Sequence, residues 1–160
     1  MKKLMILTCV LFAADQLSKY IIVSLVPYGA IIKVIPFFNF FNITNVHNTG
    51  AAFSILQGNN LAFTILIVVV LSAAGLWFYF NANKITLLQK YAFCLIFAGG
   101  LGNLTDRIFR GAVVDFLDFG INSLRWPAFN VADSCICIAA GLIVIDILKT
   151  NNNLQITNNK

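Results

Sequence analysis

The acidic residues of this chain are few, and they are the groups most able to do chemistry. The 160-residue sequence contains six acidic residues, and every one of them is an aspartate. Five of them are expected to cluster toward one end of the apolar segments: Asp15, Asp106, Asp115, Asp118 and Asp133. Two carboxyl groups that face each other in a poorly solvated site cannot both ionise, so they share one proton. Such a pair supports either hydrolysis of an amide bond or proton-coupled transport.

In aspartic hydrolysis the two carboxyl groups have different tasks. The ionised group takes a proton from water as the water attacks a carbonyl, and the protonated group donates toward the carbonyl oxygen and later toward the leaving amine. Neither step needs a metal ion or a cofactor, and the single histidine, His47, offers no ligand set for zinc. Spacing does not show which aspartates pair, because the partners come from different segments.

Two of the aspartates have basic neighbours at short spacing. Asp15 and Lys19 are separated by four residues, so on a helix they share one face and can form an ion pair. The pair can be purely structural, or it can belong to a site. Asp106 and Arg107 follow a glycine-rich stretch that ends in Asn103, where small residues allow helices to approach closely.

The remaining aspartates have different surroundings in the sequence. Asp115 and Asp118 both lie in a segment between apolar runs, where an exposed loop position would explain either one. Asp133 lies a few residues inside the last apolar run, at a depth that water can reach. Asp146 precedes Lys149 by three residues, which predicts an ion pair at the other end of that run.

The elements that must position these groups are membrane helices. The chain is 59% hydrophobic and 11% charged, with a net charge of +5, and its mean hydropathy is +0.85. Soluble domains are about 45–50% apolar and about 25% charged. The composition therefore excludes a soluble enzyme, a disordered tail and a nucleic-acid-binding module. The dispersed basic residues suit a membrane protein that follows an orientation rule.

Four apolar stretches are long enough, or nearly so, to cross a bilayer, which requires roughly 20 residues. They cover residues 4–26, 61–80, 87–104 and 129–148. The sequence thus predicts an all-α membrane protein with one domain, two longer outer segments at residues 27–60 and 105–128, and a polar, frayed C-terminal tail at residues 149–160.

The distribution of lysines predicts the orientation. The short segments on one side hold Lys2, Lys3, Lys84, Lys149 and Lys160, and Lys90 lies near the end of a predicted span on that same side. Because positive residues favour the cytoplasmic side, both termini are expected there. The N-terminus also resembles a cleavable secretory signal, but Phe12 stands where a small residue would be needed and the apolar run resumes at Tyr20. We therefore expect the first helix to be retained.

The outer segment at residues 27–60 has the pattern of a small sheet. Phe38, Phe40, Ile43 and Val46 alternate with polar residues, which favours extended chain. A turn is expected at residues 48–53, where the backbone comes close to another group.

Five short motifs in order resemble the lipoprotein signal peptidases, the signal peptidase II family of bacterial aspartic intramembrane proteases. Residues 15–19 read Asp-Gln-Leu-Ser-Lys, and residues 48–53 read Asn-Thr-Gly-Ala-Ala-Phe. Residues 102–107 read Gly-Asn-Leu-Thr-Asp-Arg, and residues 113–116 read Val-Val-Asp-Phe. Residues 129–134 read Phe-Asn-Val-Ala-Asp-Ser. Each motif is weak alone, but five in order across four spans are specific.

The resemblance implies a fold and a site. The fold is four transmembrane helices with a small extracytoplasmic β-cradle, and the implied catalytic pair is Asp115 and Asp133. Eight further positions would bind substrate or support the site: Asp15, Lys19, Asn48, Gly50, Asn103, Asp106, Arg107 and Asn130. Among these, Asn48, Asn103, Arg107 and Asn130 are expected to hydrogen-bond the substrate backbone.

The resemblance also implies an activity and a location. The substrates would be lipidated prolipoproteins, cut on the amino side of the diacylglyceryl-modified cysteine. The enzyme would reside as a monomer in the bacterial inner membrane, in contact with membrane lipid and not nucleic acid, with its site facing the periplasm. The competing classes are a proton-coupled transporter, for which only Asp146 could serve as an inside-facing acid, and a structural membrane subunit, which would not need so many converging polar residues.

Overall fold

Four long helices form the bulk of the molecule in the computed structural model, which describes residues 2–50 and 58–158, the last seven as backbone only. The helices are α1 (Lys2–Leu25), α2 (Asn60–Asn81), α3 (Leu87–Phe109) and α4 (Val131–Asn158). Each is long and apolar enough to cross a membrane. At a rise of about 1.5 Å per residue, each reaches the roughly 30 Å of a hydrocarbon core. The four predicted spans are therefore present as helices.

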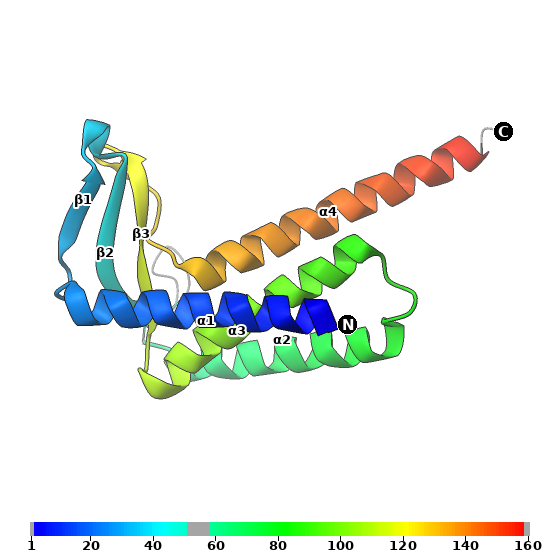
Figure 1. Ribbon diagram of the computed structural model, residues 1–160, viewed down its shortest axis with the longest axis horizontal. Coiled ribbons are helices and arrows are strands. Elements are labelled where there is room, and N and C mark those ends of the chain that lie inside the picture. Colours follow the sequence, from blue (N-terminus) through cyan, green and yellow to red (C-terminus); the bar gives the residue numbers. More distant parts are fainter. Residues whose placement is uncertain (1, 51–57, 159–160) are drawn as a thin grey trace.

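Two helix boundaries differ from the sequence-based expectation. Helix α3 continues to Phe109, so Asp106 and Arg107 lie within the helix and not after its end. Helix α4 continues to Asn158, so most of the tail that was expected to fray is helical, and it projects beyond the other helices in Figure 1. Apolar periodicity marks membrane depth, but a helix can continue into polar sequence once its backbone bonds are formed.

A four-stranded antiparallel sheet stands across one end of the helices (Figure 1). Its strands are β1 (Ile31–Ile35), β2 (Phe41–Asn48), β3 (Val113–Ile121) and β4 (Leu124–Arg125), in that order. The sheet predicted within residues 27–60 is confirmed for β1 and β2. Phe38, however, lies in a short 3-10 turn with a positive φ of 53°, and Phe40 ends that turn, so neither is in a strand.

Strand β3 was not predicted, and it changes the position of two aspartates. Asp115 pairs with Val46 and Asp118 with Asn42 across β2 and β3, so neither lies in a loop. Val114 and Phe116 of this strand pack against Ile22 and other residues at the end of α1. This small core fixes the height of β3 above the helices.

Helix α3 is the most enclosed of the four and contacts the other three. Glycines allow this approach, as predicted from their spacing. A Cβ at Gly102 would lie 2.5 Å from Asp15 Oδ2, and one at Gly99 would collide with the backbone of Ala132. The glycines therefore bring α1 and α4 against α3 at the level of the buried polar residues.

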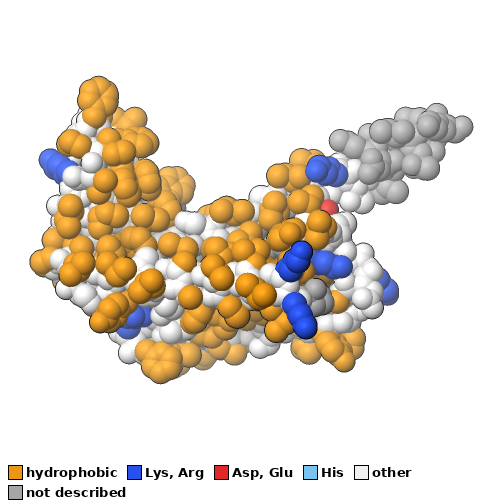
Figure 2. Space-filling model, in the orientation of Figure 1, with side chains coloured by type: hydrophobic (Ala, Val, Ile, Leu, Met, Phe, Trp, Pro, Cys, Tyr) orange, Lys and Arg blue, Asp and Glu red, His pale blue; other side chains and the backbone are white. Residues whose placement is uncertain are grey.

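The helix surfaces are apolar, and the lysines gather at one end. Figure 2 shows hydrophobic side chains over the helices, and most of its basic side chains lie at the end away from the sheet, with others at the sheet end. Only 6% of the most apolar stretch of α2 is buried within the protein. Such a surface is suited to lipid and not to water.

Asp146 has partners that the sequence did not predict. Its carboxylate accepts hydrogen bonds from Thr86 Oγ1 and Gln89 Nε2, both at 2.7 Å. Thr86 and Gln89 also form the capping box that begins α3. The expected ion pair with Lys149 is therefore wrong: Asp146 instead joins α4 to the start of α3.

Candidate active site

Asp115 and Asp133 line one cavity of about 610 Å³ where β3 meets the start of α4. Asp115 is 3% exposed, whereas Asp133 is partly exposed to the cavity. Asn48, Gly50, Asn103 and Arg107 line the same space. The two aspartates that the family resemblance selected thus come together from different elements, and six of the ten predicted site residues face one cavity.

Asn130 joins the two aspartates. It precedes the first residue of α4, and its Oδ1 accepts the backbone N–H of Asp133 at 2.9 Å. In return, Asp133 Oδ2 accepts the backbone N–H of Asn130 at 3.2 Å, which completes a reciprocal helix cap. The remaining end of the amide, Nδ2, donates to Asp115 Oδ1 at 2.7 Å. The helix cap therefore sets the spacing of the two carboxyl groups.

Asn48 holds the other oxygen of Asp115. Its Nδ2 donates to Asp115 Oδ2 at 3.0 Å, and its Oδ1 accepts the backbone N–H of Gly50 at 2.9 Å. Because Gly50 fixes the oxygen end, the nitrogen end must face Asp115. The rest of this predicted motif, residues 51–53, lies outside the described residues.

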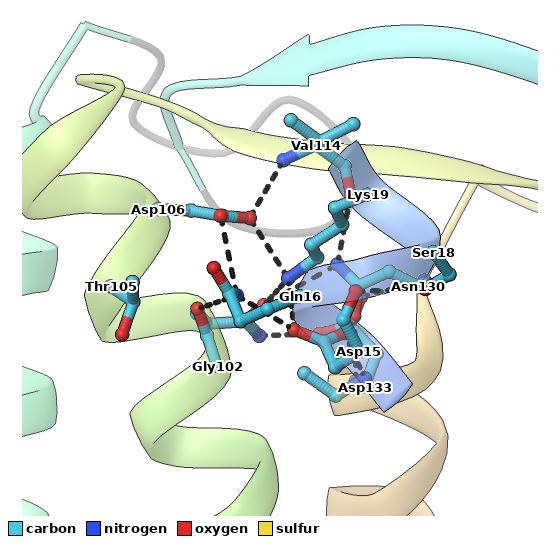
Figure 3. A network of polar contacts seen from close by, with 12 residues as sticks. Asp15, Gln16, Ser18, Lys19, Gly102, Thr105, Asp106, Val114, Asn130 and Asp133 are labelled. Atoms are coloured by element: carbon cyan, nitrogen blue, oxygen red, sulfur yellow. Dashed lines mark hydrogen bonds and ion pairs between the residues drawn. The ribbon is translucent and has the colours of Figure 1, made fainter. Parts of the chain in front are cut away.

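A buried lysine, Lys19, lies among three polar partners, two of which, Asp15 and Asp106, are labelled in Figure 3. Lys19 Nζ is 2.9 Å from Asp15 Oδ2, 2.9 Å from Asp106 Oδ2 and 3.1 Å from Asn103 Oδ1. The predicted pair of Asp15 and Lys19 is thus present, and both residues are almost fully buried. A buried ammonium requires such compensation. Removing one partner of a buried ion pair typically destabilises a protein by about 3–5 kcal/mol, because the other charge is left unpaired.

The two acids that neutralise Lys19 also hold the backbone beside the aspartate pair. Asp15 Oδ1 accepts the N–H of Ala132 at 2.8 Å, and Asp106 Oδ2 accepts the N–H of Val114 at 3.2 Å. Ala132 directly precedes Asp133, and Val114 directly precedes Asp115. The ion cluster therefore aligns both segments that carry the candidate catalytic groups.

Asn103 connects this ion cluster to Asp133. Its oxygen faces Lys19, and its Nδ2 donates to Asp133 Oδ1 at 2.8 Å. Asn48, Asn103 and Asn130 were expected to hydrogen-bond the substrate backbone. In the structure, at least one amide N–H of each is directed instead at a candidate catalytic carboxylate.

Arg107 forms hydrogen bonds with other residues around the cavity. Its Nη2 donates to the carbonyl of Gly50 at 2.7 Å, and its Nη1 donates to Asn60 Oδ1 at 3.0 Å. Its guanidinium also lies 5.0 Å from the centre of the Phe63 ring. The predicted contact with substrate is untested, and the observed contacts tie the sheet and α2 to α3.

Several residues at the site were not predicted. Gln16 donates to Asp15 Oδ2 and to the carbonyl of Gly102, both at 3.1 Å. A polar side chain inside an apolar span was the available signal. The apolar wall of the cavity was missed because it carries no such signal; it includes residues 126–129 and 136–138.

Asp118 lies only three residues from Asp115 and has a different environment. Its carboxylate is paired with Arg125 at 2.8 Å and accepts a hydrogen bond from Asn42 at 2.9 Å. It does not line the cavity described above. These contacts give Asp118 a role within the sheet.

Burial alters the acidity of Asp115. Desolvation, followed by the charge of Asp133, raises the pKa of Asp115 to about 7, although the hydrogen bonds from Asn48 and Asn130 oppose the rise. A carboxyl group with that pKa can hold a proton near neutral pH and still release it. The arrangement is suited to general acid–base chemistry on water and a carbonyl group.

The sequence and the fold both match known proteins. The family described as signal peptidase (SPase) II matches residues 7–149. A lipoprotein signal peptidase of Alteromonas mediterranea is 44% identical over 144 residues, which cover 88% of this chain and 78% of that protein. One from Staphylococcus aureus is 41% identical over 157 residues, which cover 95% and 94%. A bacterial membrane enzyme structure solved by the in meso method shares the fold with a TM-score of 0.86 and 37% identity, covering 96% of this chain and 92% of that one.

Proposed function

This chain belongs to the signal peptidase II family, and we propose that it is an aspartic endopeptidase that removes signal peptides from lipidated prolipoproteins. Family membership identifies it as a protease, and its four helices identify it as a multi-pass membrane protein. The proposal adds the catalytic mechanism, the substrate and the cleavage position. The observation that carries it is that Asp115 and Asp133 line one cavity, with Asn130 hydrogen-bonded to both.

The proposed reaction uses one proton shared between Asp115 and Asp133. The ionised carboxyl group takes a proton from water as the water oxygen attacks the scissile carbonyl, and the protonated one donates to the carbonyl oxygen. The tetrahedral intermediate then releases the amine, which leaves with a proton from the pair. The hydrogen bonds to both carboxyl groups support this proposal, because they pre-organise the pair before substrate binds.

The proposed cleavage lies on the amino side of the diacylglyceryl-modified cysteine. A substrate whose cysteine carries lipid is held at the membrane surface, so its scissile bond has a fixed depth. Asp133 lies in the first turn of a membrane helix, about one helical turn from the helix end, which is a suitable depth for that bond. A helical signal peptide must unwind there to expose a carbonyl, and the polar lining of the cavity could accept its freed backbone groups.

The proposed orientation has both termini in the cytoplasm and the cavity at the periplasmic face. The exposed lysines Lys2, Lys3 and Lys84 support it, because they lie at the helix ends opposite the sheet. Positive residues near helix ends favour the cytoplasmic side. Prolipoproteins would then reach the cavity from the outer leaflet of the inner membrane.

The proposal is tested with the purified protein and a lipidated precursor in detergent or nanodiscs. We expect release of the signal peptide, with a new N-terminus at the lipidated cysteine when the product is sequenced by mass spectrometry. A precursor that lacks the diacylglyceryl group should be cut far more slowly. Equal cleavage of both precursors, or a cut at another peptide bond, would contradict the proposed substrate.

A further inference from the structure

We propose that the aspartate pair is asymmetric: Asp133 carries the negative charge, Asp115 carries the proton, and Asn103 is the positioning residue that maintains this difference. The inference rests on the proposed function and deepens it, because an aspartic mechanism requires only that one of the two groups be protonated. The two carboxyl groups lie in different environments.

Asp133 lies where a negative charge is stabilised. It is in the first turn of α4, and its Oδ2 accepts a backbone N–H of the helix cap at 3.2 Å. The N-terminus of a helix carries roughly half a positive elementary charge. Asp133 is also the more exposed member of the pair, so its carboxylate can contact water in the cavity.

Asn103 donates a hydrogen bond to Asp133, and the charge of Lys19 fixes the orientation of its amide. Its Oδ1 accepts from Lys19 Nζ at 3.1 Å and from Asn130 Nδ2 at 3.3 Å. An ammonium has only donors, so reversing the amide would place two donor groups against each other. The Nδ2 of Asn103 therefore faces Asp133 Oδ1, at 2.8 Å, and stabilises the ionised form.

Asp115 lacks both of these features. It lies within a strand, and among the described residues it accepts side-chain hydrogen bonds only from the neutral amides of Asn48 and Asn130. Within the described part of the chain, no cationic group forms an ion pair with it. Its side chain is almost fully buried, and the raised pKa described above has burial as its largest cause.

The other charged groups around the pair do not reverse this difference. Asp15 and Asp106 are each 2.9 Å from Lys19 (Figure 3), and Asp106 is also ion-paired with Arg110, so two cations face these two carboxylates. Arg107 lines the cavity and keeps its charge, because its acceptors at Gly50 and Asn60 are neutral, but among the described residues it forms an ion pair with neither Asp115 nor Asp133. Asn103 alone of these side chains contacts both Lys19 and Asp133, so it links the ammonium to that carboxylate.

The assignment gives a balanced cycle. Asp133 takes one proton from water while the water oxygen bonds to the carbonyl carbon, and Asp115 gives its proton to the carbonyl oxygen. When the C–N bond breaks, Asp133 gives its proton to the leaving nitrogen. Asp115 recovers a proton from the hydroxyl as the carbonyl reforms. Both groups return to their starting states, and one water has been consumed.

The chain offers a direct test, because it has six aspartates and no glutamate. Wild-type protein labelled with ¹³Cγ-aspartate would be titrated by NMR in micelles, with each resonance assigned by an Asp→Asn substitution. As the pH is lowered through about 7, the Asp115 resonance should shift to that of a carboxylic acid while Asp133 remains a carboxylate. Protonation of Asp133 first, or equal shifts of both resonances, would overturn the assignment.

Asn103→Ala tests the positioning role, with Asn42→Ala as its matched control. Asn42 also donates to an aspartate, Asp118, at 2.9 Å, but in the sheet and away from the cavity. We expect the acid limb of the kcat profile to move to higher pH by roughly one to two units in Asn103→Ala, as expected from losing one hydrogen bond to a charged group. It should not move in Asn42→Ala.

An unchanged acid limb in folded Asn103→Ala would contradict the positioning role. If that variant does not fold, the wild-type titration still decides the proton assignment. The two proposals can fail separately. The proton assignment is tested by the titration, which needs no turnover, whereas the proposed function is tested by whether Asp115→Asn and Asp133→Asn lose cleavage.

Discussion

Asp15 on the first helix accepts the backbone N–H of Ala132 at the start of the fourth, 117 residues later, at 2.8 Å. The same carboxylate is 2.9 Å from Lys19, so one buried acid serves both the ion cluster and the segment that carries Asp133. Stability and alignment of the candidate site are therefore coupled through residues that do not face the cavity.

The first prediction follows from the two acids around Lys19. Lys19→Ala should strongly destabilise the protein, since Asp15 and Asp106 would lose their buried counter-charge. Adding Asp15→Asn should restore only part of the thermal stability, because Asp106 keeps its charge and, among the residues that the structure describes, has Arg110 as its one remaining ion-pair partner. The measurement is the unfolding temperature in detergent.

The matched comparison is the triple variant Lys19→Ala, Asp15→Asn, Asp106→Asn. It should recover more thermal stability than the double variant, although the volume of the lysine side chain is still missing. Complete rescue by the double variant would show that Asp106 does not share the charge of Lys19.

The second prediction concerns the cost of keeping Asp115 buried. Because its folded-state pKa of about 7 exceeds the unfolded value, the folded state binds more protons between those two values. Stability therefore falls as the pH rises through that range and is then constant. Asp115→Asn removes the penalty, so its gain in unfolding temperature over wild type should grow from pH 4 to pH 7.

The control is Asp118→Asn, because Asp118 is ion-paired with Arg125. Its unfolding temperature should be slightly below that of wild type, by the equivalent of roughly 1 kcal/mol for a partly exposed pair. A pH-independent gap between Asp115→Asn and wild type would argue against the raised pKa.

The third prediction concerns topology. In a background with the four cysteines replaced by alanine, Ser123→Cys lies in the exposed turn between β3 and β4, and Asn83→Cys lies in the exposed turn between α2 and α3. An impermeant thiol reagent added to intact spheroplasts should label only Ser123→Cys. Labelling of Asn83→Cys alone would place the cavity on the cytoplasmic side.

The sequence predicted well what depends on local pattern. Apolar runs indicated the helices because length and composition alone decide whether a segment can cross a bilayer. The pair of Asp15 and Lys19 was predictable because four residues on a helix make one turn. The family resemblance, now confirmed, chose Asp115 over Asp118, a choice that spacing left open.

Features that depend on contacts between distant segments could not be predicted. Strand β3 was missed because its pairing with β2 joins residues about 70 positions apart, such as Val46 and Asp115. The partners of Asp146 were missed for the same reason, since a nearby lysine in sequence was the only local signal. The direction of each amide also depends on what lies at its other end.

The fourth prediction tests the central claim most directly: cleavage of a lipidated precursor by wild type, Asp115→Asn, Asp133→Asn and Asp118→Asn. Asparagine is nearly isosteric with aspartate but can neither take the proton of water nor donate an acidic proton. We expect the first two variants to remain folded and lose cleavage by at least about a thousandfold, Asp118→Asn to keep most activity, and EDTA to have no effect on wild type. Loss of activity in Asp118→Asn with retention in Asp115→Asn would contradict the residue assignment, and undiminished cleavage by all three variants would contradict the aspartic mechanism.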